Sequence, residues 1–226
     1  MRLIIFDLDQ TLVDFLPVHD EATRLLFRRF FDVDVRMTEI DFAGKSLTEN
    51  FEELARIKNV PEQMFRDKKQ QALEAYEAAF AESLHREVAT CVLPGARELL
   101  DALSKTDHVV ALYTGNSAAI VEQVLQVAGL GRYFAFCFYG TDVEKRSDMV
   151  RMAIARARES TGQHFSDGDI VVIGDSVRDI ESGKAYGART IAVATGSHSR
   201  DDLLKAEPDY LFDSLREYRK VLSVIG

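Results

Sequence analysis

Acidic side chains follow an apolar run near the start of this sequence. The run from Leu3 to Phe6 leads into Asp7 and Asp9, two carboxylates separated by a single residue. Like charges this close repel each other, and burial at a strand end penalises each of them. Such a pair therefore needs compensating charge from elsewhere in the chain, and its residue types suit ion binding and proton transfer.

Three further segments carry polar groups of complementary kinds. These groups are Thr114, Gly115 and Asn116 at the end of HVVALYTG, Asp175 and Asp179 at and after the end of DIVVIGD, and Lys145 and Arg146 within GTDVEKRSD. Ligands of an open parallel sheet bind beyond the carboxyl ends of its strands. We therefore expect acids, a hydroxyl and a cation from distant parts of the chain to converge at one edge of one sheet.

Short apolar runs bounded by turn residues predict the strands of that sheet. The runs are RLIIFDL, HVVALYTG, FAFCFYG, DIVVIGD, RTIAVATG and DYLFD. Continuous apolar runs are typical of strands buried on both faces of a parallel sheet. Helical patterns lie between most of them, over residues 95–103, 118–127, 148–158 and 177–186. The alternation predicts an α/β fold with a doubly wound, mainly parallel sheet.

Residues 15–89 interrupt this alternation, because they contain helical stretches and no convincing strand. One of these stretches begins at Pro61, a residue suited to a first helical turn, and carries apolar residues on one face. We interpret residues 15–89 as an inserted helical module, and residues 1–14 and 90–226 as the core that contains the sheet. Pro94 and Gly95 mark the return of the chain to the sheet.

Composition excludes several classes of function. The chain has 226 residues and a formal net charge of −9, which argues against sequence-independent nucleic-acid binding. Cys91 and Cys137 have no paired spacing, so neither a disulfide framework nor a zinc knuckle is expected. No signal peptide or membrane-spanning run is evident. We expect a cytoplasmic protein without a membrane or nucleic-acid partner, whose oligomeric state is open.

Taken in order, the motifs resemble those of the haloacid dehalogenase-like superfamily, in particular its phosphoglycolate-phosphatase-like subgroup. That family has Asp-x-Asp-x-Thr after the first strand, Ser or Thr after the second, then Lys or Arg, then Gly-Asp-x-x-x-Asp. This chain has DLDQT, LYTGN, EKR and GDSVRD in that order, over nearly its whole length. The resemblance implies a Rossmann-like core with a helical cap inserted after the first strand.

The resemblance also implies roles for the acids. Asp7 would be the nucleophile that forms an aspartyl-phosphate, and Asp9 would protonate the leaving oxygen and later deprotonate water. Mg²⁺ would be held by the side chains of Asp7 and Asp175 and by the backbone carbonyl of Asp9. Asp179 would support the metal through water or hold the active-site cation.

Other positions complete the implied site. Thr114 and the backbone amides of Gly115 and Asn116 would bind the phosphate, and Thr11 would orient the nucleophile loop. The cation is Lys145 or Arg146. This choice stays open because the proline that often follows the family's lysine is missing here.

We also draw expectations for Gln10 and Lys45. Gln10 stands where the family commonly has glycine, and because glutamine lacks glycine's tolerance of positive φ, we expect an ordinary backbone conformation there. Gly44-Lys45-Ser46 resembles a cap loop that reaches over the active site in phosphoglycolate-phosphatase-like members. Lys45 is accordingly a candidate substrate contact, and a surface lysine beside a glycine turn is an equal alternative.

The predicted function is Mg²⁺-dependent hydrolysis of a small phosphorylated metabolite. The alternatives are a phosphomutase of a sugar phosphate and a catalytically silent binding member of the family. Asp9 argues against a dehalogenase and a phosphonatase, and the length of the chain argues against a receiver domain. Phosphoglycolate, a sugar phosphate and a nucleoside monophosphate all fit as substrates.

Overall fold

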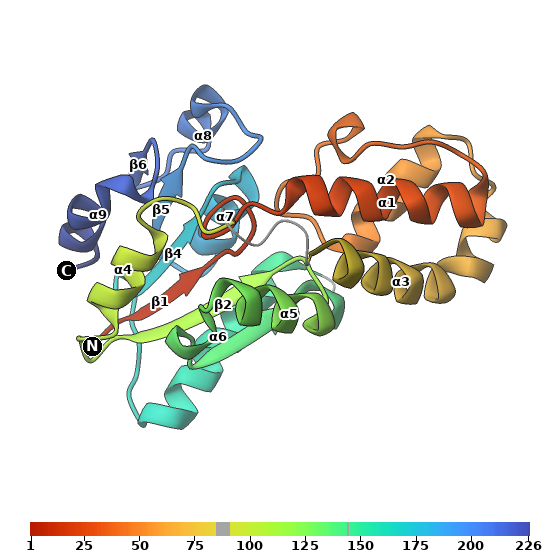
Figure 1. Ribbon diagram of the computed structural model, residues 1–226. Helices are drawn as coiled ribbons and strands as arrows, with labels where there is room; N and C mark the ends of the chain where they lie inside the picture. Colours follow the sequence, from red (N-terminus) through yellow and green to blue (C-terminus); the bar gives the residue numbers. More distant parts are fainter. Residues whose placement is uncertain (85–90, 144) are drawn as a thin grey trace.

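A six-stranded parallel sheet organises the protein. The computed structural model describes residues 1–84, 91–143 and 145–226 (Figure 1). The strands are β1 (Leu3–Phe6), β2 (Val109–Thr114), β3 (Phe136–Tyr139), β4 (Ile170–Gly174), β5 (Arg189–Val193) and β6 (Tyr210–Phe212). They are arranged in the order β3-β2-β1-β4-β5-β6 with parallel pairing throughout. Every predicted strand is present, and the prediction of a Rossmann-like doubly wound α/β fold is confirmed.

The first strand lies in the middle of this sheet. β1 pairs with β2 on one side and with β4 on the other, so Phe6 lies beside both Leu112 and Ile173. All residues of β1 and β4 are buried, and alternate residues of β1 belong to two different hydrophobic clusters. Both faces of these strands are therefore covered, which explains why their sequences are continuously apolar.

Helices cover both faces of the sheet. They are α4 (Ala96–Leu103), α5 (Ala118–Ala128) and α9 (Tyr218–Ile225) in one cluster, α6 (Arg146–Thr161) in the other, and α7 (Val177–Lys184) and α8 (Arg200–Lys205) beside β5. The predicted helical segments agree with α4, α5, α6 and α7. Helix α6 begins at Arg146, two residues before the expected start, and this shift matters for the site.

Three helices lie together at the end of the sheet to which β1 runs (Figure 1). They are α1 (Leu16–Phe31), α2 (Leu47–Ile57) and α3 (Glu62–Leu84), with a short 3₁₀ turn at Met37–Glu39. Phe51 of α2 packs edge-on against Phe27 of α1 at 5.9 Å and against Tyr76 of α3 at 5.0 Å between ring centroids. Aromatic packing thus joins the three helices to one another.

The division of the chain into a core and a cap stays a prediction. One hydrophobic cluster runs from the sheet into α1, α2 and α3. The second expected boundary falls on residues 85–90, which lie outside the described residues. Cys91 is buried and Cys137 is half-buried. In the described ranges no helix has the length and apolar character needed to cross a membrane.

Candidate active site

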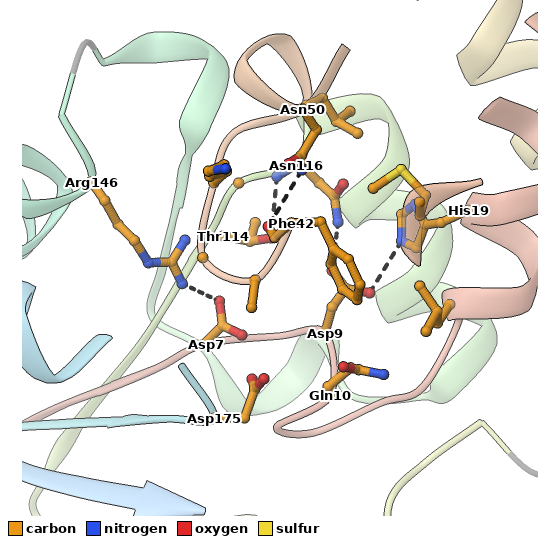
Figure 2. A pocket seen from close by; sticks show the side chains of 17 residues that line it. Asp7, Asp9, Gln10, His19, Phe42, Asn50, Thr114, Asn116, Arg146 and Asp175 are labelled. Atoms are coloured by element: carbon orange, nitrogen blue, oxygen red, sulfur yellow. Dashed lines mark hydrogen bonds and ion pairs between the residues drawn. The ribbon is translucent and has the colours of Figure 1, made fainter. Parts of the chain in front are cut away.

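The carboxyl ends of three neighbouring strands meet at one edge of the sheet. Asp7 follows β1, Thr114 ends β2 and Asp175 follows β4. The backbone N–H of Asp7 donates to the carbonyl of Ile173 at 2.9 Å, which ties the end of β1 to the end of β4. The expected convergence of these groups is therefore observed (Figure 2).

Asp7, Asp175 and Asp179 form a buried carboxylate cluster. One oxygen atom from each lies within 4.8 Å of the others, and the three residues are only 7%, 3% and 2% exposed, respectively. Arg146 pairs with Asp7 and Asp179, but one positive charge cannot balance three carboxylates. Oxygen ligands with surplus negative charge suit Mg²⁺, so this donor set fits a divalent cation.

The protonation behaviour of the cluster reflects its crowding. Burial raises the pKa of Asp7 to about 7; Arg146 opposes this rise, and repulsion from Asp179 and Asp9 adds to it. Burial also raises the pKa of Asp175 well above its ordinary value, reinforced by repulsion from Asp7 and Asp179. A bound cation would favour the ionised forms of both carboxyls.

Asp179 anchors the active-site arginine. Its Oδ1 accepts hydrogen bonds from Arg146 and from the Tyr113 hydroxyl at 2.6 Å. Its Oδ2 accepts from the Ser176 backbone N–H at 2.9 Å and from the Ser176 hydroxyl at 2.7 Å. Burial alone would raise the pKa of Asp179, but Arg146 and these hydrogen bonds lower it. Of the two roles expected for Asp179, the geometry corresponds to holding the cation.

Arg146 and Lys145 occupy different environments. The guanidinium of Arg146 donates to Asp7 and Asp179, and it lies over the Tyr113 ring at 4.3 Å from the centroid. Arg146 is the first residue of α6, whereas Lys145 is its N-cap and is exposed. The start of the helix thus directs the arginine toward the strand ends, and the geometry favours Arg146 as the site cation.

Asp9 faces the helical side of the site. Its Oδ2 accepts from the Asn116 side-chain amide at 2.6 Å, and its Oδ1 lies 3.2 Å from His19 Nε2. His19 Nδ1 in turn lies 2.5 Å from the Tyr76 hydroxyl. The carboxylate of Asp9 is therefore held by one residue from the sheet edge and one from α1. The contribution of its backbone carbonyl to a metal stays a prediction.

His19 and Tyr76 are site residues that the sequence analysis missed. His19 is one of five histidines scattered along the chain, and Tyr76 lies within the helical stretch that begins at Pro61. A usable signal was present: His19 lies on the buried face of α1 together with Val18 and Ala22. A buried polar side chain on such a face requires a partner.

The segment after β2 supports the site through its side chains and through close packing. The Asn116 backbone N–H donates to the Thr114 hydroxyl at 3.2 Å. A Cβ atom on Gly115 would overlap the carbonyl oxygen of Lys45, so glycine permits the loop of residues 41–46 to approach the strand end. The Gly115 carbonyl accepts from the Leu47 N–H at 3.1 Å.

Thr11 and Gln10 shape the nucleophile loop. The Thr11 hydroxyl donates to Asp175 Oδ1 at 2.8 Å, which ties this loop to the acid cluster. The expectation of an ordinary backbone at Gln10 is wrong, because its φ is 60°. The turn is held there by hydrogen bonds from the Gln10 N–H to the Val13 carbonyl at 2.6 Å and from the Thr195 hydroxyl to the Gln10 carbonyl at 2.5 Å.

A loop from the helical part covers the cavity. Arg178 of α7 donates to the Ala43 carbonyl at 2.6 Å and to Asp41 at 2.8 Å, which anchors this loop to the core. Lys45 lines the cavity, and its ammonium pairs with Glu53 of α2. Asp7, Asp9, Thr114, Asn116, Arg146 and Asp175 line the same cavity (Figure 2).

Comparisons with known proteins agree with this arrangement. The family model described as haloacid dehalogenase-like hydrolase matches residues 4–193. A phosphoglycolate phosphatase from Vibrio vulnificus (strain YJ016) is 25% identical over 231 residues, covering 99% of this chain and 97% of the relative. Among solved structures, a hydrolase from Pseudomonas syringae superimposes with a TM-score of 0.79 at 20% identity, with full coverage of both chains. A predicted phosphoglycolate phosphatase from Haemophilus somnus 129PT gives 0.74 at 19% identity, covering 98% of each chain.

The fold and the site define a Rossmann-like α/β protein in which two aspartates, Asp7 and Asp9, follow the central strand of a parallel sheet. The family model covers most of the chain, including the segments that contribute Asp7, Thr114, Arg146 and Asp175. The chain belongs to the haloacid dehalogenase-like hydrolase family, and the resemblance drawn from its motifs is confirmed.

Proposed function

We propose that this protein hydrolyses a small phosphomonoester in a Mg²⁺-dependent reaction that passes through an aspartyl-phosphate on Asp7. The observation that carries the proposal is the meeting of Asp7, Asp9 and Arg146 in one cavity, beside the buried carboxylate cluster. The enzyme class, a phosphoric monoester hydrolase, is confirmed by the family and by the phosphatases among its relatives.

In the first half of the reaction a carboxylate oxygen of Asp7 attacks phosphorus while the bond to the leaving oxygen breaks. Asp9 donates a proton to that leaving oxygen, so an alcohol departs. Its carboxyl is already oriented by Asn116 and His19. Arg146, held by Asp179, offers N–H donors next to the attacking oxygen.

In the second half the aspartyl-phosphate is hydrolysed. Asp9, now ionised, takes a proton from water, and the water oxygen attacks phosphorus to release phosphate and regenerate Asp7. The Thr114 hydroxyl, at the end of β2, is a proposed donor to the phosphoryl oxygens. Asp7, Asp175 and the Asp9 carbonyl would hold Mg²⁺, whose positive charge would offset repulsion between the carboxylates and the phosphate.

The proposal is tested with p-nitrophenyl phosphate as a generic substrate. We expect Mg²⁺-dependent release of p-nitrophenol that stops on addition of EDTA and in the Asp7→Asn variant. Phosphate release by Asp7→Asn at the wild-type rate would contradict the mechanism. Conversion of a hexose 1-phosphate into its isomer without phosphate release would instead favour the phosphomutase. Labelling of Asp7 by an acyl phosphate without any turnover would favour the silent member.

A cytoplasmic location and the absence of a nucleic-acid partner stay predictions from composition. A small phosphorylated substrate follows from the phosphatase class.

A further inference from the structure

Two buried amide oxygens, on residues that line the cavity, lack partners. Across residues 1–84, 91–143 and 145–226, the buried side-chain oxygen and nitrogen atoms without a hydrogen-bond partner are Gln10 Oε1 and Asn50 Oδ1. Both residues line the cavity that contains Asp7 and Asp9. A buried acceptor that receives no hydrogen bond is costly and rare. Two such atoms on residues that line one cavity indicate that its occupant brings donors.

Asn50 carries most of this argument. It lies on α2, is only 4% exposed, and lines the cavity from the helical side (Figure 2). Its Nδ2 lies 3.5 Å from the carbonyl oxygen of Phe42. Reversing the amide would place two oxygen atoms opposite each other, so the Phe42 carbonyl sets the orientation. The oxygen without a partner is consequently Oδ1.

The basic side chains of the cavity are already paired. Lys45 pairs with Glu53, Arg146 pairs with Asp7 and Asp179, and His19 contacts Asp9. In the described part of the chain, each basic residue that lines the cavity thus has an acidic partner. A second anionic group on the substrate would meet acceptor oxygens and a lysine whose charge is compensated.

We propose that the leaving group is a neutral alcohol that carries further hydroxyl groups, as in a polyol phosphate or sugar phosphate. One of these hydroxyls donates to Asn50 Oδ1, and Gln10 Oε1 is a second acceptor. A hydroxy acid such as glycolate is disfavoured, because its carboxylate offers no donor to these oxygens. This inference rests on the proposed phosphatase function and specifies its substrate class.

The first test compares substrates on the wild-type protein. With p-nitrophenyl phosphate as the reference, we expect kcat/KM for glycerol phosphate to exceed that for 2-phosphoglycolate by about 100-fold. A value for 2-phosphoglycolate equal to or above that for glycerol phosphate overturns the inference. A higher value for phosphoethanolamine than for glycerol phosphate also overturns it, since the acceptors would then recognise an ammonium group.

The second test removes the acceptor on α2. Asn50→Leu has a similar shape and lacks the oxygen, so kcat/KM for glycerol phosphate should fall about 10- to 100-fold. This fall should exceed the fall for p-nitrophenyl phosphate by about tenfold, because the aryl group has no hydroxyl to bind. An equal fall for both substrates would mark a structural role for Asn50 and overturn the assignment.

The third test removes the acidic partner of Lys45. Glu53→Gln should raise kcat/KM for 2-phosphoglycolate about tenfold, because the ammonium can then pair with the substrate carboxylate. Glu52→Gln is the matched control: it makes the same charge change on the same helix, where Glu52 pairs with Lys69 and does not line this cavity. Equal responses in the two variants would overturn the claim that Glu53 compensates Lys45.

The outcomes separate this inference from the function on which it rests. Turnover of p-nitrophenyl phosphate together with preference for 2-phosphoglycolate overturns the substrate class alone. Failure to hydrolyse any of these esters, including p-nitrophenyl phosphate, overturns the proposed function and the substrate class with it.

Discussion

The two sides of the cavity are built from different kinds of polar group. On the sheet side, Asp7, Asp175 and Asp179 bring three buried carboxylates against one arginine. On the helical side, Lys45 is balanced by Glu53, and the buried side chain of Asn50 is a neutral amide whose oxygen has no partner. One side therefore carries uncompensated charge, and the other carries unpaired hydrogen-bonding capacity.

From this difference we expect the sheet side to carry out the chemical step and the helical side to recognise the substrate. Phosphoryl transfer depends on charge placed at the reacting atoms, and surplus acid attracts the metal that the reaction needs. Selection among alcohols depends on hydrogen bonds to neutral groups, where an unpaired partner is penalised. Variants on the sheet side should therefore change the rate with every substrate, whereas those on the helical side should change it with some substrates more than with others.

The largest expected effect comes from Asp7→Asn. Removal of the proposed nucleophile should lower kcat/KM for p-nitrophenyl phosphate by about 10⁴-fold or more. Asp14→Asn makes the same chemical change nearby, at an exposed residue outside the cavity, and should stay within about twofold of the wild type. A comparable loss in both variants would contradict the specific role of Asp7.

Stability without metal should depend on pH through Asp7. Its pKa is about 7 in the folded state and about 4 in an unfolded chain, so the native state binds more protons between these values. The free energy of unfolding should therefore fall as pH rises from about 4 to 7, by on the order of 4 kcal/mol for this group.

Denaturant unfolding in EDTA between pH 4.5 and 8 measures this fall. Saturating Mg²⁺ should oppose the loss at pH 8, because it binds the ionised native carboxylates. Asp7→Asn should reduce the pH dependence, while Asp175 continues to contribute. A metal-free stability that rises between pH 5 and 7 would contradict the crowded carboxylate cluster.

Arg146 and Lys145 provide a matched pair of cations. Arg146→Gln should lower kcat with p-nitrophenyl phosphate by about 10²- to 10³-fold, since it removes donors beside Asp7. Lys145→Gln, which changes an exposed neighbour, should stay within about twofold. Circular dichroism at matched temperature checks that both variants are folded. Loss of turnover in Lys145→Gln alone would reverse the assignment drawn from the geometry.

A smaller effect is expected where the helical side supports Asp9. Tyr76→Phe removes only the hydroxyl that contacts His19 Nδ1, and the loss of one hydrogen bond should lower kcat by about two- to tenfold. Tyr113→Phe is the counterpart on the sheet side, where the hydroxyl contacts Asp179. An unchanged kcat in Tyr76→Phe would show that His19 holds Asp9 without this partner.

The smallest effect concerns the backbone at Gln10. Because its φ is 60°, Gln10→Gly should be more stable than Gln10→Ala by about 1 kcal/mol. Both variants remove the side-chain amide, so the comparison isolates the backbone term. Equal unfolding free energies in urea would indicate that the turn relaxes in the variants.

Much of the sheet side was predictable from local sequence. β1 and β4 are continuous apolar runs because they are buried on both faces, and Asp7 and Asp175 directly follow them. The helical side was harder to predict. Lys45 and Glu53 are eight residues apart, and His19 reaches an aspartate and a tyrosine on separate elements. Contacts of this kind leave no periodic signal in the chain.

The amino-acid sequence by itself determined the order of strands and helices, the family and the acids at the sheet edge. These properties follow from burial patterns and motif spacings that are local in the chain. The tertiary structure decided that Arg146 rather than Lys145 points inward, that Gln10 adopts a left-handed conformation, and that Lys45 meets an acid. Each of these outcomes depends on which groups packing brings within hydrogen-bonding distance, and neighbouring residues in the sequence do not specify it.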